Sequence, residues 1–207
     1  MNTSVQPSRV RELLAYRTID LVTIATLGVA FGVVFWGWDR LYYGAKLATL
    51  ISYPPSTGLF GGPWLLAAVV GGIIIRKPGA ALATEFVAAN LEYILPGNEW
   101  GSGVLISGLL QGLGVEIVLA LFLYRRFDVV VATLGAIAAA SIESVYEWDA
   151  YWATTFTTAT QRWAYLGFFA LSGAVVAGLG GWALTRALAR AGVLDSFGPG
   201  REAAHEV

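Results

Sequence analysis

The sequence predicts an all-α, polytopic membrane protein with six transmembrane helices and both termini in the cytoplasm. The chain has 207 residues, of which 57% are hydrophobic and only 13% charged, whereas a typical soluble domain is about 25% charged. Apolar stretches long enough to cross a bilayer recur along it. Basic residues gather in alternate connections between these stretches, which is the pattern of a multi-pass protein.

Six apolar stretches of about the length of a membrane span follow one another. A span needs roughly 20 apolar residues. We expect spans at about 19–38, 59–75, 79–95, 102–124, 129–148 and 163–184. They divide the chain into a cytoplasmic N-terminal segment (1–18), a six-helix substrate-binding domain (19–190) and a cytoplasmic tail (191–207).

Two further segments, 39–58 and 149–162, are too polar to span. Segment 39–58 contains three tyrosines and two prolines. This length and composition suit a lid over a binding site, and equally a plain segment at the membrane interface, where tyrosine is common. Both interpretations stay open at this stage.

The basic residues select the orientation. With six spans, one side of the membrane carries ten basic residues and the other carries three. The first group is Arg9, Arg11, Arg17, Arg76, Lys77, Arg125, Arg126, Arg186, Arg190 and Arg201, and the second is Arg40, Lys46 and Arg162. Because cytoplasmic loops are enriched in lysine and arginine, the termini are expected to be cytoplasmic.

Four carboxylates lie inside the predicted spans: Glu85, Glu92, Glu116 and Glu143. A charge at the centre of a span costs roughly 2.5–3.5 kcal/mol on insertion scales, so such groups usually face a protein interior or a wet cavity. Counting about 1.5 Å per helical residue from the basic turns, Glu92, Gln111 and Glu143 lie at similar depth on three different helices. The sequence therefore predicts a polar site inside the bundle.

Helical phase refines this site. Glu85 and Glu92 are seven residues apart and share a face, and Glu143 and Glu147 share another with Tyr146 beside them. Gln111 and Glu116 are five apart, about 140° around a helix, so they cannot both face one small pocket squarely. Glu92 and Glu143 carry the strongest functional interpretation of these acids. Glu85 and Glu116 are equally well explained as buried groups that only hold helices together, and Glu147 has the alternative of a group wetted at a helix end.

Tryptophans cluster near the outer ends of the spans. Carboxylates beside aromatic faces suit an organic cation or an aminated ring, because the acid supplies charge and the ring stacks. Alternatively, each tryptophan belongs to the interfacial belt of membrane proteins. The candidate ligand-binding residues from this cluster are Trp36, Trp100, Trp148 and Trp163.

The first span carries small residues on one face: Ala25, Gly28 and Gly32. Small residues four apart let helices approach closely in lipid, where apolar packing has no hydrophobic drive. This face is predicted to bind either another span of the chain or a partner subunit.

Several functional classes are disfavoured by composition. The chain has no cysteine and a single histidine, His205 in the polar tail, so we expect no metal site, no catalytic histidine centre and no cofactor. The net charge of -1 argues against nucleic acid as a partner.

The chain resembles the substrate-capture (S) components of energy-coupling-factor vitamin transporters, and most closely a YkoE-type family of permease components. The resemblance covers the first half best, and the second half matches by span count, length and the cluster of acids and aromatics at 143–148. The residues that carry it are Phe35-Trp36-Gly37-Trp38-Asp39, Gly61-Gly62-Pro63-Trp64, Arg76-Lys77-Pro78-Gly79-Ala80-Ala81-Leu82, Glu85, Glu92 and Trp100-Gly101.

This resemblance implies a bacterial plasma-membrane protein without enzymatic activity, which binds thiamine or its hydroxymethylpyrimidine precursor from outside. A transmembrane coupling (T) subunit and cytoplasmic ATPase subunits would be its partners, and the small-residue face of the first span would meet the coupling subunit. Three alternatives remain from the residues alone: an integral-membrane enzyme that uses the acids, a stand-alone transporter in which Glu85 and Glu116 relay protons, and a purely structural subunit.

Overall fold

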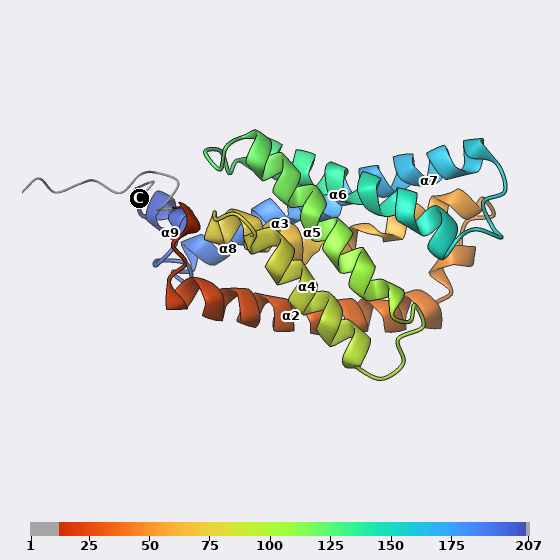
Figure 1. The fold of residues 1–207 in the computed structure, drawn as a ribbon, viewed down its shortest axis with the longest axis horizontal. Coiled ribbons are helices and arrows are strands. Elements are labelled where there is room, and N and C mark those ends of the chain that lie inside the picture. Colours follow the sequence, from red (N-terminus) through yellow and green to blue (C-terminus); the bar gives the residue numbers. More distant parts are fainter. Residues whose placement is uncertain (1–12, 206–207) are drawn as a thin grey trace, which may run out of the picture.

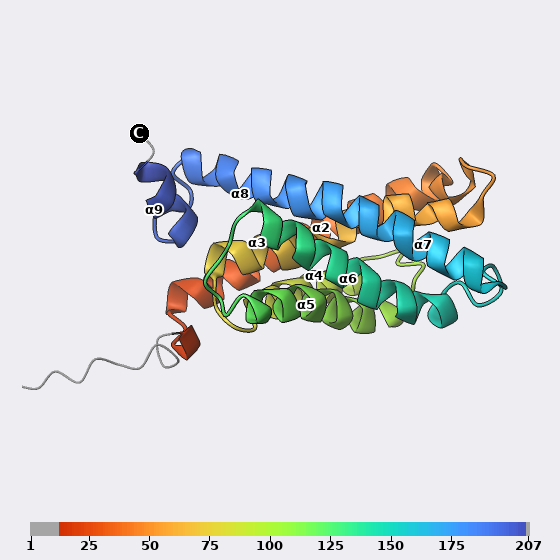
Figure 2. The ribbon, with the colours of Figure 1, turned by 90° about the horizontal axis from the view of Figure 1, so that it is seen from above.

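The computed structural model describes residues 13–205, and within this part of the chain every regular element is a helix. The helices form one elongated bundle whose members run along its long axis (Figures 1 and 2). The first described residues and the last helix, α9, lie at the same end of the bundle (Figure 1). We call this the terminal end, and the opposite end, which holds segments 45–65 and 151–158, the distal end. Arg9 and Arg11 lie outside the described residues, as do most of segment 1–18 and the last two residues of the tail.

Helix α2 (Thr18–Gly44) is the first long element. At its start the Asp20 carboxylate accepts a hydrogen bond from the backbone N–H of Arg17 at 2.8 Å, and it also pairs with the Arg17 and Lys77 side chains. The helix continues past the expected end at Trp38 to Gly44, so the first part of the predicted loop 39–58 is helical. This extension buries Asp39 and Tyr42 within the bundle.

Helix α2 packs against α4 (Ala80–Ile94) through two glycines. Gly28 and Gly32 are buried, and a methyl group added at Gly32 would meet Leu91 Cβ at 2.7 Å and the backbone oxygen of Ala88 at 2.8 Å. The small-residue face thus joins two helices of this chain. The two glycines are not accessible to a partner subunit, and of the three residues predicted for that role only Ala25 is exposed.

The predicted second span, 59–75, is not one continuous helix. After the short 3₁₀ turn η1 (Leu47–Thr49), the chain forms 3₁₀ helices η2 (Pro54–Phe60) and η3 (Gly62–Leu65), and a regular α-helix begins only at α3 (Leu66–Ile75). The helix axis bends by 43° between the two arms, Pro54–Phe60 and Gly62–Ile75. Prolines and glycines in 54–63 remove backbone donors and loosen the helix, which accounts for the break.

Ser172 secures this break from the facing helix α7 (Ala159–Ser172). Its Oγ accepts a hydrogen bond from the backbone N–H of Gly62 at 3.0 Å and donates to the backbone oxygen of Leu59 at 2.6 Å. Backbone polar groups away from water must find partners within the protein. Ser172 supplies partners to both sides of the break.

The remaining helices complete the bundle. Helix α5 (Gly103–Leu121) leads through a short turn to α6 (Val129–Ala150), whose N-terminus is capped by the Asp128 carboxylate. The last long run consists of α7, a π-helical segment η4 (Gly173–Gly180) and α8 (Gly181–Arg190). This run starts before the expected residue 163 and ends beyond residue 184, whereas α4, α5 and α6 agree closely with the predicted spans.

A short helix, α9 (Gly198–Ala204), lies within the predicted tail and folds back onto the terminal end. Arg76 donates two hydrogen bonds to Glu202, at 2.5 and 2.8 Å. This pairing holds the pKa of Glu202 below its ordinary value. The turn Arg76-Lys77-Pro78-Gly79 joins α3 to α4 as expected, with Arg76 and Gly79 in the left-handed region.

Four helical runs of the described chain are long and apolar enough to cross a membrane: α2, α5, α6 and the continuous run from Ala159 to Arg190. The bent pair Pro54–Phe60 and Gly62–Ile75 adds a fifth candidate. Helix α4 has 15 residues and is shorter than these. Length and composition therefore support four or five of the six expected spans.

Replacing Ser172 by alanine is expected to lower the thermal stability of the protein in detergent, because it leaves the Gly62 N–H and Leu59 oxygen without partners. We expect a loss of about 1–3 kcal/mol. Ser141→Ala is the control, since the Ser141 hydroxyl bonds only to Ile137 within its own helix. Equal melting temperatures for the two variants would contradict the role given to Ser172.

Gly32→Ala is expected to destabilise the protein, because the added methyl group pushes α2 away from Leu91 and Ala88. Gly37→Ala on the same helix meets nothing within 4 Å and removes a poor helix former, so it should be neutral or stabilising by up to about 1 kcal/mol. Thermal unfolding of both variants measures the difference. A Gly32→Ala protein as stable as Gly37→Ala would show that the helices are not in close contact here.

Candidate functional site

A cavity opens among the helices toward the distal end. The space among its lining residues amounts to about 540 Å³, which includes open solvent at the mouth of the cavity. Residues from every long helical run contribute to it. Its lining consists of Tyr42, Thr57, Gly61, Trp64, Glu85, Ala89, Glu92, Trp100, Val104, Ser107, Gly108, Gln111, Glu147, Tyr151, Trp152, Tyr165 and Phe169.

Glu85 forms the inner wall of the cavity and also caps a helix. The backbone N–H of Ala68, in the first turn of α3, donates to Glu85 Oε2 at 2.6 Å. The N–H groups of a helix's first turn have no partner within the helix and carry partial positive charge. The break before α3 therefore creates a positive helix end inside the bundle, and a carboxylate from α4 satisfies it.

Gln111 bridges this carboxylate to the break. With its amide nitrogen facing two oxygens, it donates to the backbone oxygen of Trp64 at 3.0 Å and to Glu85 Oε1 at 3.2 Å. Gln111, Glu85 and Glu92 thus share one cavity. The predicted depth grouped Gln111 with Glu92, and the predicted helical face grouped Glu85 with Glu92. Their positions are set by α4 and α5, which pack closely because Gly108 lies against Ala89.

Glu92 meets a second acid, Asp39, at the side of the cavity. The two carboxyl groups lie near each other, without a hydrogen bond of good geometry between them among the described residues. Asp39 also accepts from the indole N–H of Trp100 at 3.0 Å, while its second oxygen is buried without a partner among the described residues. Asp39 lies behind Glu92 and Trp100, and its hydrogen bond fixes the position of the Trp100 ring.

Glu147 faces the cavity from the distal end of α6. The phenol of Tyr165 donates a short hydrogen bond to Glu147 Oε2. Glu143 lies one turn deeper on the same helix, near Ser107 and Gln111. Within the described part of the chain, both Glu143 oxygens are buried without a hydrogen-bond partner of good geometry. Glu143 is therefore a buried acid just behind the cavity wall rather than part of its lining.

Aromatic rings surround the carboxylates, and Trp100 lies at their centre. Its ring centroid is 5.2 Å from that of Tyr151, 5.7 Å from Tyr42 and 6.0 Å from Trp64. The indole N–H groups of Trp64 and Trp152 are buried without a hydrogen-bond partner of good geometry, near Glu92 and Glu147 respectively. The cavity thus brings carboxylates and aromatic ring faces together, with two indole N–H groups buried in its wall.

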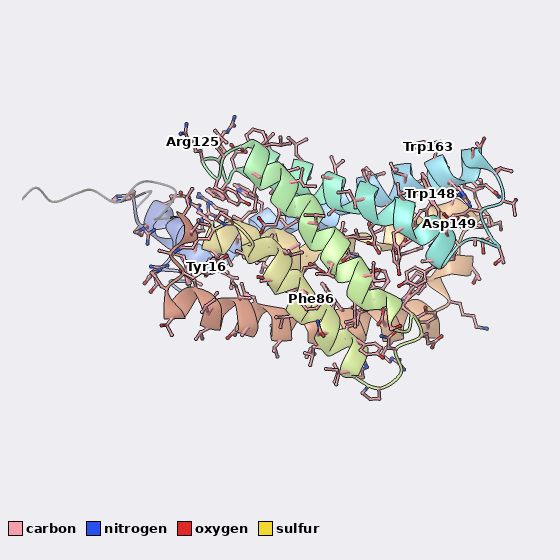
Figure 3. The ribbon with its side chains drawn as sticks, in the orientation of Figure 1. Tyr16, Phe86, Arg125, Trp148, Asp149 and Trp163 are labelled. Carbon is pink, nitrogen blue, oxygen red and sulfur yellow. The ribbon has the colours of Figure 1, made fainter. Side chains whose placement is uncertain are left out.

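Four predicted aromatic residues lie outside the lining. Trp36 donates its indole N–H to the backbone oxygen of Pro96, and Tyr146 packs behind Tyr151. Trp148 and Trp163 contact each other at the distal end, where Trp163 is largely exposed. Figure 3 shows these two tryptophans and Asp149 together at that end. Their positions fit the interfacial belt that the sequence left open as an alternative.

Several lining residues were not among the predicted site residues: Tyr42, Thr57, Trp64, Ser107, Tyr151, Trp152 and Tyr165. Trp64 directly follows the Gly61-Gly62-Pro63 break, so the turn chemistry of that segment was the available signal. Tyr42 and Thr57 share a 2.5 Å hydrogen bond across the segment expected to be a loop. Tyr42 lies in the part of α2 that was expected to be a loop, and Thr57 lies in a 3₁₀ helix, so the predicted helical phase covered neither residue.

Glu116 has a different place from the cavity acids. Its Oε1 accepts from the backbone N–H groups of Ala81 at 2.8 Å and Leu82 at 3.3 Å, in the first turn of α4, and its Oε2 accepts from the phenol of Tyr124 at 2.5 Å. Glu116 is thus a capping group, and it points away from the cavity that Gln111 faces. The 140° separation between the two residues predicted this divergence.

The cavity wall is acidic without a basic counterpart. Within residues 13–205, no lysine or arginine lines the cavity. The same described residues contain no group of three or more His, Cys, Asp or Glu side chains placed to hold a metal ion. The arrangement therefore favours a ligand that brings its own positive charge or its own N–H donors.

Comparisons with known proteins identify the family of this chain. A family model described as "ABC-type cobalt transport system, permease component" matches residues 19–142, more than half of the chain. The chain belongs to this permease family. It is 29% identical, over 191 residues that make up 91% of this chain and 92% of the relative, to "Putative HMP/thiamine permease protein YkoE" of Bacillus subtilis (strain 168).

A solved structure of the same kind matches the fold. "Crystal structure of an S-component of ECF transporter" superposes with a TM-score of 0.83 at 28% identity, covering 93% of this chain and 95% of that chain. The chain is thus an S component of the energy-coupling-factor type, an integral membrane protein and the substrate-binding subunit of an importer. Its relatives are transporter components rather than enzymes, and S components work with a coupling subunit and ATPases.

Glu116→Ala is expected to lower the stability of this S component by about 1–3 kcal/mol, because the first-turn N–H groups of α4 and the Tyr124 hydroxyl lose a buried acceptor. Thermal unfolding in detergent measures the loss, with Glu99→Ala as the control, since Glu99 is exposed in the loop between α4 and α5. A Glu116→Ala protein as stable as this control would contradict the capping role.

Proposed function

We propose that the distal cavity captures thiamine or its hydroxymethylpyrimidine precursor from outside the cell and holds it for transport inward. The observation that carries this proposal is one cavity in which Glu85, Glu92 and Glu147 face an enclosure of aromatic rings without any basic residue in the lining. The name of the Bacillus subtilis relative, an HMP/thiamine permease, supports the same ligand.

The chemistry of the ligand matches the cavity group by group. Thiamine carries a fixed positive charge on its thiazolium ring, which a carboxylate compensates and an aromatic face attracts. Its aminopyrimidine offers N–H donors and ring nitrogens that accept. Glu92 and Glu147 are the proposed acceptors of these N–H groups and partners of the charge, and Trp64 and Trp152 have N–H groups to donate.

Glu85 is proposed to contribute mainly through position. One of its oxygens is already bonded to the Ala68 N–H and the other to Gln111. It therefore shapes the inner wall and holds Gln111, whereas Glu92 and Glu147 retain capacity for a ligand. Glu143 would support Gln111 and Ser107 from behind.

The proposed placement in the membrane rests on helix length and on the positions of the basic residues. We infer six spans, with α4 as the short sixth span beside the five candidates, and both termini in the cytoplasm. The basic residues Arg17, Arg76, Lys77, Arg125 and Arg126 lie at or near the terminal end, as the positive-inside rule requires for a cytoplasmic face. The cavity then opens on the outside, where an imported vitamin arrives.

The alternatives are less well supported. A proton relay through Glu85 and Glu116 conflicts with their engagement as acceptors of first-turn N–H groups on two different helices. An enzyme that uses the acids has no counterpart among the relatives. Transport of thiamine in liposomes without any ATPase would favour a stand-alone carrier over the proposed capture subunit.

Glu92→Gln and Glu147→Gln are each expected to weaken thiamine binding at least about tenfold, because a hydrogen bond to a charged group contributes about 1.5–3 kcal/mol. Quenching of tryptophan fluorescence, or calorimetry on the purified protein, measures the dissociation constant. Titrations with hydroxymethylpyrimidine and thiamine phosphate then identify the preferred form.

The matched control is Asp149→Asn, which removes a carboxylate from the same helix as Glu147 but on an exposed side chain that pairs with Arg162. It should bind thiamine like the wild type. If both glutamine variants bind thiamine and hydroxymethylpyrimidine as tightly as this control does, the proposed ligand placement is wrong.

A further inference from the structure

A second cavity lies at the terminal end, far from the vitamin site. It holds about 790 Å³ of space, counted to its open mouth, between the ends of α3 and α8, the α5–α6 turn and α9. Its charged lining residues are Arg76, Arg125, Arg126, Arg186, Asp128 and Glu202. Four guanidinium groups against two carboxylates leave an excess of two positive charges.

Part of this lining is rigidly held. Arg76 is fixed by its two hydrogen bonds to Glu202, by a bond from its Nε to the Ile73 oxygen at 3.1 Å, and by stacking 4.8 Å over the Phe127 ring. Arg186 lies 5.7 Å over the ring of Trp182. These contacts form a fixed wall of rings and guanidinium groups with little freedom to collapse.

The α5–α6 turn carries two arginines whose guanidinium groups have nitrogens outside the ion pair between Arg126 and Asp128. Arg126 bonds to Asp128 through Nε and one terminal nitrogen, so its other terminal nitrogen is not part of that pair. Within residues 13–205, Arg125 forms no ion pair, and it is exposed at the terminal end (Figure 3). Two neighbouring guanidinium groups therefore face an open cavity that already has a positive balance.

We propose that this terminal cavity binds a phosphate ester, with Arg125 and Arg126 as its principal ligands. Guanidinium groups match phosphate oxygens with paired, charge-assisted hydrogen bonds. Trp182, Phe127 and Pro199 line the same cavity and provide apolar surface for the carbon part of the ester. Enrichment of arginine on a cytoplasmic face explains the charge, but it does not explain a cavity around it.

The phosphate ester has two possible sources, the headgroup of an anionic phospholipid and a free phosphate ester in the cytoplasm. Basic cavities between spans on the cytoplasmic side suit anionic headgroups, and the position at the end of the bundle gives a lipid direct access. The experiment must therefore compare lipids and also offer a soluble ester.

Native mass spectrometry of the full-length chain in detergent tests the proposal. Phosphatidylglycerol should bind about tenfold more tightly than phosphatidylcholine. In the double variant Arg125→Gln, Arg126→Gln this preference should fall to near one. The control is the double variant Arg40→Gln, Lys46→Gln, which removes two exposed charges at the distal end and should keep the preference.

The single variant Arg125→Gln controls for loss of fold, because Arg125 forms no ion pair within residues 13–205. It should reduce the preference for phosphatidylglycerol about threefold. Glycerol 3-phosphate distinguishes the sources: displacement of phosphatidylglycerol identifies a site that accepts soluble esters, and retention of the lipid identifies a headgroup site. Equal binding of the two lipids to the wild type, or a preference that survives in the folded double variant, would overturn the proposal.

Discussion

The hydrogen bond from the Ala68 N–H to the Glu85 carboxylate is the interaction on which the rest of this structure depends. The second membrane passage is broken by prolines and glycines, so α3 starts inside the bundle with unsatisfied N–H groups. In lipid such groups must be satisfied by the protein itself. Glu85 does this from α4, and Ser172 does it for the neighbouring backbone from α7.

This solution has a functional consequence. A break that is held open by side chains from other helices leaves space between them, and Trp64 at the break becomes part of the cavity wall. Glu85, which accepts from the first turn of α3, also accepts from the Gln111 amide and so fixes its position. The same residues that make a broken helix tolerable in a membrane thus build the wall of the distal cavity.

Much of this arrangement could be predicted from the sequence, and the reason is periodicity. Helices α4, α5 and α6 are regular, so depth and phase brought Glu85, Glu92 and Gln111 into one cavity and separated Glu116 from it. Prediction was less successful where the chain departs from a regular helix. The segment 54–65 has no simple phase, so Thr57 and Trp64 were missed. Ser107 and Tyr165 lie on regular helices and were missed too, because a hydroxyl group in a span gives a weaker signal than a charged group.

The sequence also could not predict which helix packs against which face. The face with Gly28 and Gly32 fitted a partner subunit as well as another span, and only the structure shows α4 against it. Tryptophans presented the same difficulty, because a ring at the interface and a ring in a site occupy similar positions along a helix. Trp100 lies in the cavity because the loop before α5 turns inward, whereas Trp163 remains exposed.

The most direct measurement is a structure of the purified protein determined with thiamine bound. The account predicts ligand density in the distal cavity, with a ring beside Trp100 or Trp64 and an amino nitrogen within hydrogen-bonding distance of Glu92 or Glu147. Thiamine bound outside this cavity, without contact to Glu92 or Glu147, would contradict the account.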